Sequence, residues 1–400
     1  MANLLSYTYY SKIYKDGLND KKPLSTKFHV LEQQAKDILP AAGFGYVHNC
    51  AGSLETDEKN KAAFKRWSIL PTRLVGPGFP DLSVKLFGEK YDYPVALAPI
   101  GVQKVFHPKG EIAASSAAFK EDVPYILSTA TATSLEDVAK SNENGKRWYQ
   151  LYWPANENND ITASLLNRAK NNGFKVLVVT LDTYVLGWRP GDIDNAYNPF
   201  IKADNIGVAI GTSDPVFRKK FKEKYGVEVE EDMQNAAPEW TSTIFPQRNH
   251  SWEDIEFLKK HWDGPIVLKG IQTVSDAKKA VEYGVQGIIV SSHGGRQQDG
   301  AVGSLTVLPG IVDAVGKKLE IIFDSGIRSG ADITKALALG AKFVLIGRPY
   351  IYGLAVGGEE GVRHVIKSFL SDLELTLHLS GVKKVSDLSR SILFDEFKKE

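Results

Sequence analysis

The sequence lacks three things: a second cysteine, a net charge and a long apolar run. Cys50 is the only cysteine, which excludes an internal disulfide and a cysteine-rich metal site and gives no sign of an oxidising compartment. The 49 basic and 48 acidic side chains sum to a formal charge of +1, so nucleic acid and anionic lipid are not expected partners. The longest apolar stretches, such as residues 287–290 and 343–346, fall far short of the roughly 20 residues that cross a bilayer.

The two ends of the sequence show no targeting signal. The opening stretch, MANLLSYTYYSKIYKDG, is too polar and too rich in tyrosine for a secretory signal, and the closing FKKE is not a peroxisomal tripeptide. The composition, 43% hydrophobic and 24% charged, is that of a globular protein with a full core. We therefore expect a cytoplasmic protein, and no metal site is predicted.

Short apolar runs, each followed by a stretch of helical periodicity, recur from about Tyr93 onward. Eight such runs begin at Pro94, Pro124, Arg147, Lys175, Pro265, Gly287, Glu320 and Lys342. Helical spacing is clear in residues 110–121, 161–173, 275–284 and 330–340, and the last three of these stretches end in glycine. Strands that alternate with helices in this way predict an α/β fold in which a parallel sheet closes as a TIM (β/α)8 barrel.

Two regions fall outside this rhythm. Residues 1–75 form an N-terminal helical extension expected to cover an end of the barrel, which itself spans residues 76–400. Residues 195–250 form a long polar loop after the fourth strand. Loops of that length are usually functional, so we interpret this one as a lid, with a tolerated insertion as the alternative.

The carboxyl ends of the strands are where a barrel of this kind carries its chemistry, because the interior is filled. Here the seventh and eighth strands are followed by DSGIRSG and GRP. Glycines let backbone amides approach an anion, and Arg328 and Arg348 can fork onto phosphate oxygens. The pattern predicts a phosphate site, while the alternative is that Gly326 and Gly347 are turn glycines beside solvated arginines.

The segment SSHGGRQQDG after the sixth strand is the most informative. It places His293, a base that works near neutral pH, three residues before Arg296, a carboxylate anchor. After the fourth strand, Arg189 offers a second anion clamp, and Asp182 is suited to orient the imidazole, unless it is only a helix cap. Lys269 ends the fifth strand, where it faces an electron-rich ring or extends to solvent.

Together these residues resemble the FMN-dependent 2-hydroxy acid oxidising family, which includes glycolate oxidase, lactate oxidase and lactate monooxygenase. SHGGRQ is the family's signature, far more specific than a bare glycine-rich loop. The segments RWSILPTRLVGPGFPDLSVKLFG, APIGV, TLDTYVLGWRPGDIDNAYNPF and SWEDIEFLKK are most similar to lactate 2-monooxygenase. The resemblance runs from about Lys27 to the C-terminus and implies that FMN is the cofactor.

The resemblance also implies a role for each matching residue. His293 is the base and Asp182 its partner, while the substrate is bound by Tyr46, Tyr152, Arg189, His293 and Arg296. The flavin ring is contacted by Gln150, Thr180, Lys269 and Ser291, and the ribityl chain and phosphate by Asp324, Gly326, Arg328, Gly347 and Arg348. Further cofactor contacts are expected at the first two strand ends, from Pro99, Ile100, Gly101 and Ser128.

The implied reaction is the oxidation of a small L-2-hydroxy acid, L-lactate above all, with oxygen as the acceptor. Either the 2-oxo acid and hydrogen peroxide are released, or oxidative decarboxylation follows; a dehydrogenase that uses another acceptor is a further alternative. Homotetramers or homo-octamers are implied. The sequence departs from the family at Ala130, where glycolate oxidases have a tryptophan, and at Gly101, where alanine is usual. FMN-dependent isomerases would not need the His293, Arg296 and Arg189 set.

Overall fold

Eight parallel strands close into a barrel in the computed structural model, which describes residues 4–19, 24–76, 78–202 and 204–398. The order around the barrel is β10-β11-β4-β5-β6-β7-β8-β9. The bounds are β4 (Val95–Leu97), β5 (Tyr125–Ser128), β6 (Arg147–Tyr152), β7 (Val176–Thr180), β8 (Ile266–Ile271), β9 (Gly287–Val290), β10 (Glu320–Phe323) and β11 (Phe343–Ile346). All of the predicted strands, and the TIM barrel, are confirmed.

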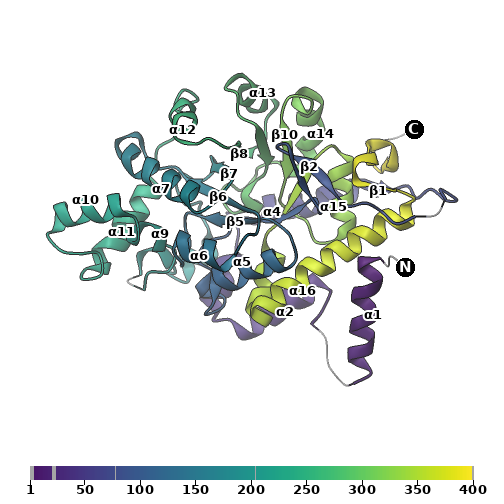
Figure 1. Ribbon diagram of the computed structural model, residues 1–400, viewed down its shortest axis with the longest axis horizontal. Helices are drawn as coiled ribbons and strands as arrows, with labels where there is room; N and C mark the ends of the chain where they lie inside the picture. The colour runs from purple at the N-terminus through teal and green to yellow at the C-terminus, as the bar shows by residue number, and fades with distance from the viewer. Residues whose placement is uncertain (1–3, 20–23, 77, 203, 399–400) are drawn as a thin grey trace.

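Helices surround the barrel on the outside (Figure 1). They are α5 (Gly110–Lys120), α6 (Leu135–Ser141), α7 (Asn159–Asn171), α12 (Ile255–His261), α13 (Val274–Glu282), α14 (Ser304–Val315), α15 (Gly330–Ala338) and α16 (Arg348–Ser380). The predicted helical stretches correspond to α5, α7, α13 and α15. Three glycines just beyond these helices have positive φ, which suits a helix end: Gly173, Gly284 and Gly340. No helix among the described residues is long and apolar enough to span a membrane.

The N-terminal end of the barrel is closed by a hairpin of β2 (Val84–Leu86) and β3 (Glu89–Tyr91). Tyr91 packs edge-on against Trp148 and Phe343, with ring centroids 6.2 and 5.3 Å apart, so aromatic side chains fill this end of the barrel. Because this end is packed, a ligand of the barrel is expected at the opposite end, where the strands have their carboxyl ends.

The N-terminal segment is helical, as predicted. It contains α1 (Leu5–Gly17), α2 (Phe28–Ile38), α3 (Ala41–His48), α4 (Glu55–Ala62) and the short η1 (Ala63–Arg66). Helix α1 stands away from the body (Figure 1), and it is tied to α16 because the backbone and side chain of Ser6 donate to Glu374. Helix α3 reaches the open mouth of the barrel, and β1 (Trp67–Ile69) pairs with β12 (Leu393–Asp395).

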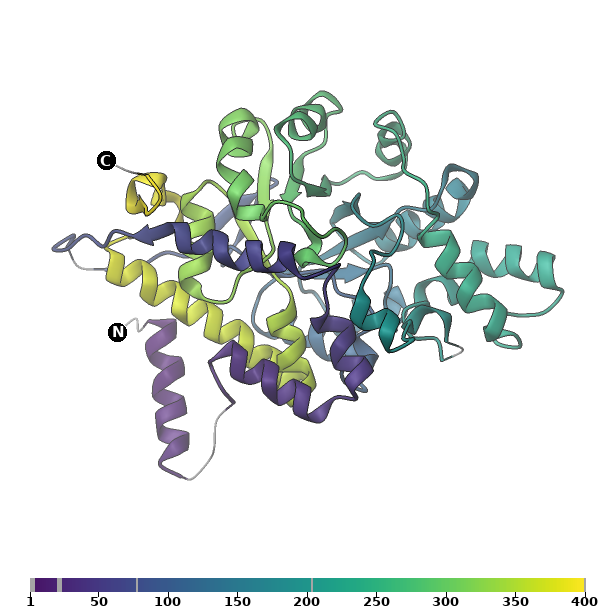
Figure 2. The same cartoon turned by 180° about the vertical axis from the view of Figure 1, so that it is seen from behind.

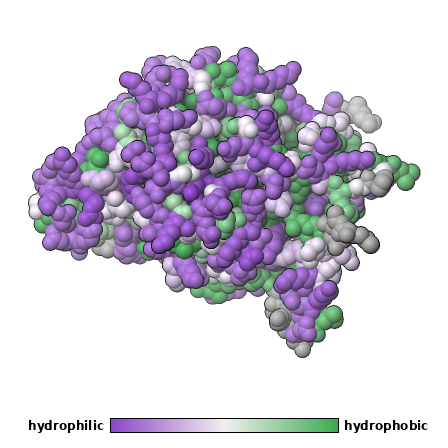
Figure 3. Space-filling view, in the orientation of Figure 1, coloured by the Kyte–Doolittle hydropathy of each residue, from purple (hydrophilic) through white to green (hydrophobic). Residues whose placement is uncertain are grey.

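The segment after β7, expected as a long loop, is a lobe of helices at the end of the molecule opposite α1 (Figures 1 and 2). Its elements are α8 (Pro190–Asp194), η4 (Pro199–Ile201), α9 (Ala209–Thr212), α10 (Pro215–Tyr225) and α11 (Met233–Ile244). Phe217, Phe221 and Trp240 form a buried core inside it, whereas its lysines and glutamates face solvent, where Figure 3 shows a largely hydrophilic surface. The polar composition suggested a loop because one face of each of these helices is exposed and carries charged side chains.

Several contacts anchor the lobe to the barrel, among them an ion pair and a ring stack. Asp214, fully buried, forms an ion pair with Arg168 of α7 at 3.2 Å, and the ring of His250 stacks on Trp153 with centroids 3.8 Å apart. The remaining short helices are η2 (Gln103–Val105), η3 (Asn156–Asn158), η5 (His293–Gly295), η6 (Val385–Asp387) and η7 (Arg390–Ile392). Whether the lobe moves as a lid stays a prediction.

Candidate active site

A cavity of about 990 Å³, open solvent at its mouth included, lies at the carboxyl ends of the strands. Most of the predicted site residues line it: Tyr46, Pro99, Ile100, Gly101, Tyr152, Arg189, Lys269, His293, Arg296, Asp324, Gly326, Arg328, Gly347 and Arg348. The others lie at strand ends without lining this cavity: Ser128, Gln150, Thr180, Asp182 and Ser291. The barrel therefore gathers residues from almost the whole chain at one mouth.

His293 lines this cavity, and the carboxylate of Asp182 contacts it from outside the lining. Nδ1 of His293 lies 2.8 Å from Oδ1 of Asp182, and the Thr183 hydroxyl donates to the same oxygen at 2.7 Å. The ionised carboxylate favours the proton on Nδ1, which leaves Nε2 as the basic atom. Asp182 therefore orients an imidazole rather than capping a helix.

The charges around this pair set its protonation. Burial lowers the pKa of His293 below its ordinary value of 6.5, and the Asp182 carboxylate offsets part of that shift. Burial by itself would raise the pKa of Asp182, but His293 and Lys269 hold it well below its ordinary value of 3.8. Near neutral pH the pair is therefore a neutral imidazole beside a carboxylate, the state that a general base requires.

The backbone after β9 explains why the sequence needs two glycines here. His293, Gly294 and Gly295 all have positive φ, at 55°, 64° and 75°. At Gly295 a Cβ would lie 2.7 Å from the backbone nitrogen of Asp57, so no larger residue fits. His293 itself occupies a conformation that is unusual for a residue with a side chain, which is typical of functional sites.

Two arginines flank the histidine. The Arg189 guanidinium is buried and donates to the Arg296 carbonyl at 2.9 Å and to Oε1 of Gln297 at 2.7 Å. Arg296 donates to the Asn49 carbonyl and lies over the Tyr46 ring, 5.2 Å from its centroid. Burial, together with the nearby Arg189, lowers the pKa of Arg296 to about 10. Two confined guanidinium groups beside each other favour an anion between them.

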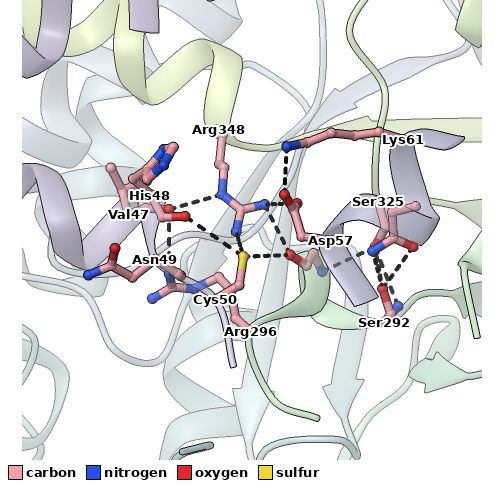
Figure 4. A network of polar contacts seen from close by, with 12 residues as sticks. Val47, His48, Asn49, Cys50, Asp57, Lys61, Ser292, Arg296, Ser325 and Arg348 are labelled. Carbon is pink, nitrogen blue, oxygen red and sulfur yellow. Dashed lines mark hydrogen bonds and ion pairs between the residues drawn. The ribbon is translucent and has the colours of Figure 1, made fainter. Parts of the chain in front are cut away.

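Arg348 is the centre of a polar network that joins the N-terminal segment to the loop after β9 (Figure 4). It donates to the Val47 carbonyl at 3.0 Å, to Sγ of Cys50 at 2.7 Å and to the Gly294 carbonyl at 3.0 Å. Asp57 lies 3.4 Å away. Arg348 is thus held by protein partners on several sides, which the sequence did not reveal.

Arg328 has fewer partners than Arg348. Among the described residues, its only side-chain hydrogen bond goes to the backbone carbonyl of the preceding residue, Ile327, at 2.9 Å. Burial and the nearby Arg348 lower its pKa, which means that a further anion would stabilise it. A Cβ on Gly347 would meet only Ile100 within 4 Å, at an ordinary contact distance of 3.9 Å. This corner is suited to a phosphate group, and the phosphate site itself stays a prediction.

The neighbouring strand ends offer groups that fit a flavin ring. Lys269 is 4% exposed, donates to Ser291 at 3.1 Å and has Asp182 and Asp324 within 3.9 and 3.7 Å, so it does not extend to solvent. Nε2 of Gln150, in the described part of the chain, is buried without a hydrogen-bond partner. A buried cation, an unpaired amide donor and the Arg328 corner together match the ring and phosphate of FMN.

Several residues of this site were missed by the sequence reasoning. Thr183 and Gln297 directly follow predicted residues, and their polar side chains could have been singled out. Phe200 and Phe245 line the cavity from the helical lobe. No local pattern marks them, because only the fold of the lobe returns them to the barrel mouth.

Comparisons with known proteins agree with this site. Residues 35–395 match the family model described as FMN-dependent dehydrogenase. An FMN-dependent alpha-hydroxy acid dehydrogenase of Schizosaccharomyces pombe is 61% identical over 97% of this chain and 96% of its own. An L-lactate oxidase of Lysinibacillus sphaericus is 41% identical over 93% of both chains. The crystal structure of mandelate oxidase superposes with a TM-score of 0.79 at 33% identity, over 93% of this chain and 98% of the other. The chain belongs to the FMN-dependent dehydrogenase family and is an FMN-dependent 2-hydroxy acid oxidoreductase.

Proposed function

We propose that this enzyme oxidises a small L-2-hydroxy acid, with L-lactate as the reference substrate, and passes the electrons to oxygen. The observation that carries the proposal is that His293, held by Asp182 at 2.8 Å, lines one cavity together with Arg189 and Arg296. A base beside two carboxylate anchors is what a 2-hydroxy acid requires. The names of the relatives support the same substrate class.

In the proposed reaction, Arg189 and Arg296 bind the substrate carboxylate and fix its position and angle. Nε2 of His293 accepts a proton, either from the hydroxyl as a hydride leaves Cα or from Cα itself. Asp182 stabilises the imidazolium that results, and Tyr46 and Tyr152 are placed to hydrogen-bond the substrate. FMN, when bound, accepts the two electrons that leave Cα and is reoxidised by an external acceptor.

We further propose roles for the cofactor residues. Lys269 would stabilise negative charge on the reduced ring, with Ser128, Gln150, Thr180 and Ser291 near it. Pro99, Ile100 and Gly101 would border the ring, while Asp324, Gly326, Arg328, Gly347 and Arg348 would hold the ribityl chain and the phosphate. The unpaired Gln150 amide and the weakly partnered Arg328 support this placement.

The fate of the product divides two versions of the reaction. If pyruvate leaves first, lactate and oxygen yield pyruvate and hydrogen peroxide. If pyruvate stays while peroxide forms, the two react to acetate, carbon dioxide and water, as in a lactate 2-monooxygenase. A dehydrogenase that uses another acceptor is the alternative to both. We also propose a cytoplasmic homotetramer or homo-octamer, to be tested by fractionation and light scattering.

Anaerobic addition of L-lactate to the FMN-loaded enzyme tests the function directly. We expect the absorbance of the oxidised flavin to bleach, and the absence of bleaching with every 2-hydroxy acid tried would refute the proposal. Aerobic turnover with product analysis then separates pyruvate plus peroxide from acetate plus carbon dioxide. Turnover that requires an artificial acceptor instead would identify a dehydrogenase.

A further inference from the structure

One wall of the active-site cavity is made of aromatic rings. Tyr46, Tyr152, Phe200 and Phe245 all line the cavity. Phe245 lies 5.0 Å from Tyr152 and 5.5 Å from Phe200, and Phe200 lies 6.2 Å from Tyr46, measured between ring centroids. These four rings form a continuous aromatic surface, which we call the aromatic wall; its two phenylalanines are apolar throughout.

The aromatic wall is held in place by the helical lobe. The Thr241 side chain in α11 donates to the Phe200 carbonyl at 3.1 Å, and the backbone nitrogen of Phe245 donates to the Thr241 carbonyl at 3.0 Å. Phe200 and Phe245 are 2% and 6% exposed, so both rings are packed into the protein. The wall is therefore preformed.

Another part of the same cavity is lined by the smallest side chain with a Cβ. Ala130, at the end of β5, contributes only a methyl group there, and its carbonyl accepts from the Val102 nitrogen at 2.9 Å. Gly101 packs against it, since a Cβ on Gly101 would lie 2.3 Å from the Ala130 carbonyl oxygen. The two backbones are therefore in close contact, and Ala130 borders the cavity with nothing larger than a methyl group.

No charged group of the cavity remains to pair with the side chain of the substrate in our proposal. Among the described lining residues they are Arg189, Lys269, His293, Arg296, Asp324, Arg328 and Arg348. Our proposal assigns each of them to the substrate carboxylate, the base or the cofactor. The aromatic wall and Ala130 carry no charge, so a second carboxylate on the substrate side chain would be desolvated there without a counter-ion.

We infer that the site prefers L-2-hydroxy acids whose side chain is apolar and larger than the methyl group of lactate, either branched aliphatic or phenyl. The aromatic wall and the part of the cavity bordered by Ala130 receive that side chain. This inference rests on the proposed function and specifies its substrate. Burial of additional apolar groups against the wall would be gained in the transition state as well as on binding.

Substrate comparison with the FMN-loaded enzyme tests the inference. We expect kcat/KM for L-2-hydroxyisocaproate or L-3-phenyllactate to exceed that for L-lactate by about tenfold or more, with glycolate and L-malate lower still. A second readout avoids turnover: phenylpyruvate should raise the melting temperature of the enzyme more than pyruvate does at equal concentration. Equal or higher kcat/KM for glycolate would overturn the inference.

Substitution of Ala130 tests whether this residue causes the preference for larger apolar side chains. In Ala130→Trp the indole would fill the part of the cavity bordered by Ala130, so the ratio of kcat/KM for L-3-phenyllactate to that for L-lactate should fall by about tenfold or more. The matched control is Val274→Trp, which adds the same ring at a half-exposed position outside the cavity and should leave the ratio unchanged. If the tryptophan variant does not fold, Ala130→Val and Ala130→Leu should lower the ratio in steps, and a ratio that stays constant in them would overturn the role of Ala130.

The outcomes separate this inference from the function beneath it. If no 2-hydroxy acid bleaches the flavin, the proposed function itself is wrong. If glycolate or lactate bleaches it faster than the larger acids, the function stands and the inference fails.

Discussion

The charged side chains in the two halves of the cavity differ in how many protein partners they have. We call the half around His293 the reacting half and the half around Arg328 the phosphate half. In the reacting half, Arg189, Arg296 and His293 are each bonded to protein partners at 2.5–2.9 Å. In the half proposed for the phosphate, the Arg328 side chain donates only to the backbone carbonyl of the preceding Ile327 among the described residues. Groups that must hold an exact angle are fixed before the substrate arrives, whereas Arg328, unlike the firmly held Arg348, keeps donors that a cofactor anion can use. Substitutions should therefore affect rate in one half and cofactor affinity in the other.

The largest effect is expected at the base. His293→Gln should lower the rate of flavin reduction by about 10²- to 10⁴-fold, because the variant loses the basic Nε2 that accepts the substrate proton in the proposed reaction. FMN should stay bound, since its phosphate corner is unchanged. Stopped-flow reduction and the flavin content of the purified variant measure the two effects.

The matched control for this variant is His29→Gln, which changes an exposed histidine on α2 and should leave the rate unchanged. Normal reduction in His293→Gln would remove that residue from the reaction.

A smaller loss of activity is expected when a carboxylate-binding arginine is replaced by lysine, which keeps the charge but not the guanidinium group. Arg296→Lys should lower kcat/KM by about 10- to 100-fold, because an ammonium group cannot reproduce two parallel hydrogen bonds to a carboxylate. Arg390→Lys is the control, since Arg390 is a surface residue paired with Asp313 at 2.8 Å. An equal effect in both variants would argue against a specific carboxylate site.

In the phosphate half, we expect the affinity for FMN to change instead. Arg328→Met should raise the dissociation constant of FMN by about 10- to 100-fold through the loss of charge-assisted hydrogen bonds. The contrast is Arg348→Met, which should also lower the melting temperature of the FMN-free protein, because Arg348 joins Val47, Cys50 and Gly294. Fluorescence titration and thermal unfolding distinguish them, and FMN binding that is unaltered in Arg328→Met would place the phosphate elsewhere.

The pH dependence should show the mildest effect. Because burial lowers the pKa of His293, the neutral imidazole persists below pH 6.5, and kcat/KM should fall only in more acidic solution. In Asp182→Asn the carboxylate that raises this pKa is gone, so the acid limb should move to still lower pH while the maximal rate decreases. A limb that moves toward neutral pH would contradict this electrostatic assignment. The measurement is kcat/KM against pH for both proteins.

Much of the site could be predicted because its residues follow strands. Each predicted strand is confirmed, and parallel strands in a closed barrel bring their carboxyl ends to one mouth, so His293, Arg296, Lys269 and Arg328 had to meet. The lobe after β7 could not be predicted in the same way. Its charged surface helices suggested a loop, and its core of Phe217, Phe221 and Trp240 is assembled by contacts between helices. Arg348 was assigned to phosphate alone, because its partners come from the distant α3 and α4 segment.

The sequence by itself determined the barrel, because short-range periodicity and strand ends encode it locally. The FMN cofactor followed from the resemblance to a known family, and the roles of the reacting groups stay a prediction. Only the tertiary structure decided which apolar residues form the aromatic wall and which arginine keeps free donors. Those properties depend on contacts between segments more than a hundred residues apart, such as Tyr46 with Phe200 and Val47 with Arg348. Pairings of that kind follow from how the chain packs, and no local pattern records them.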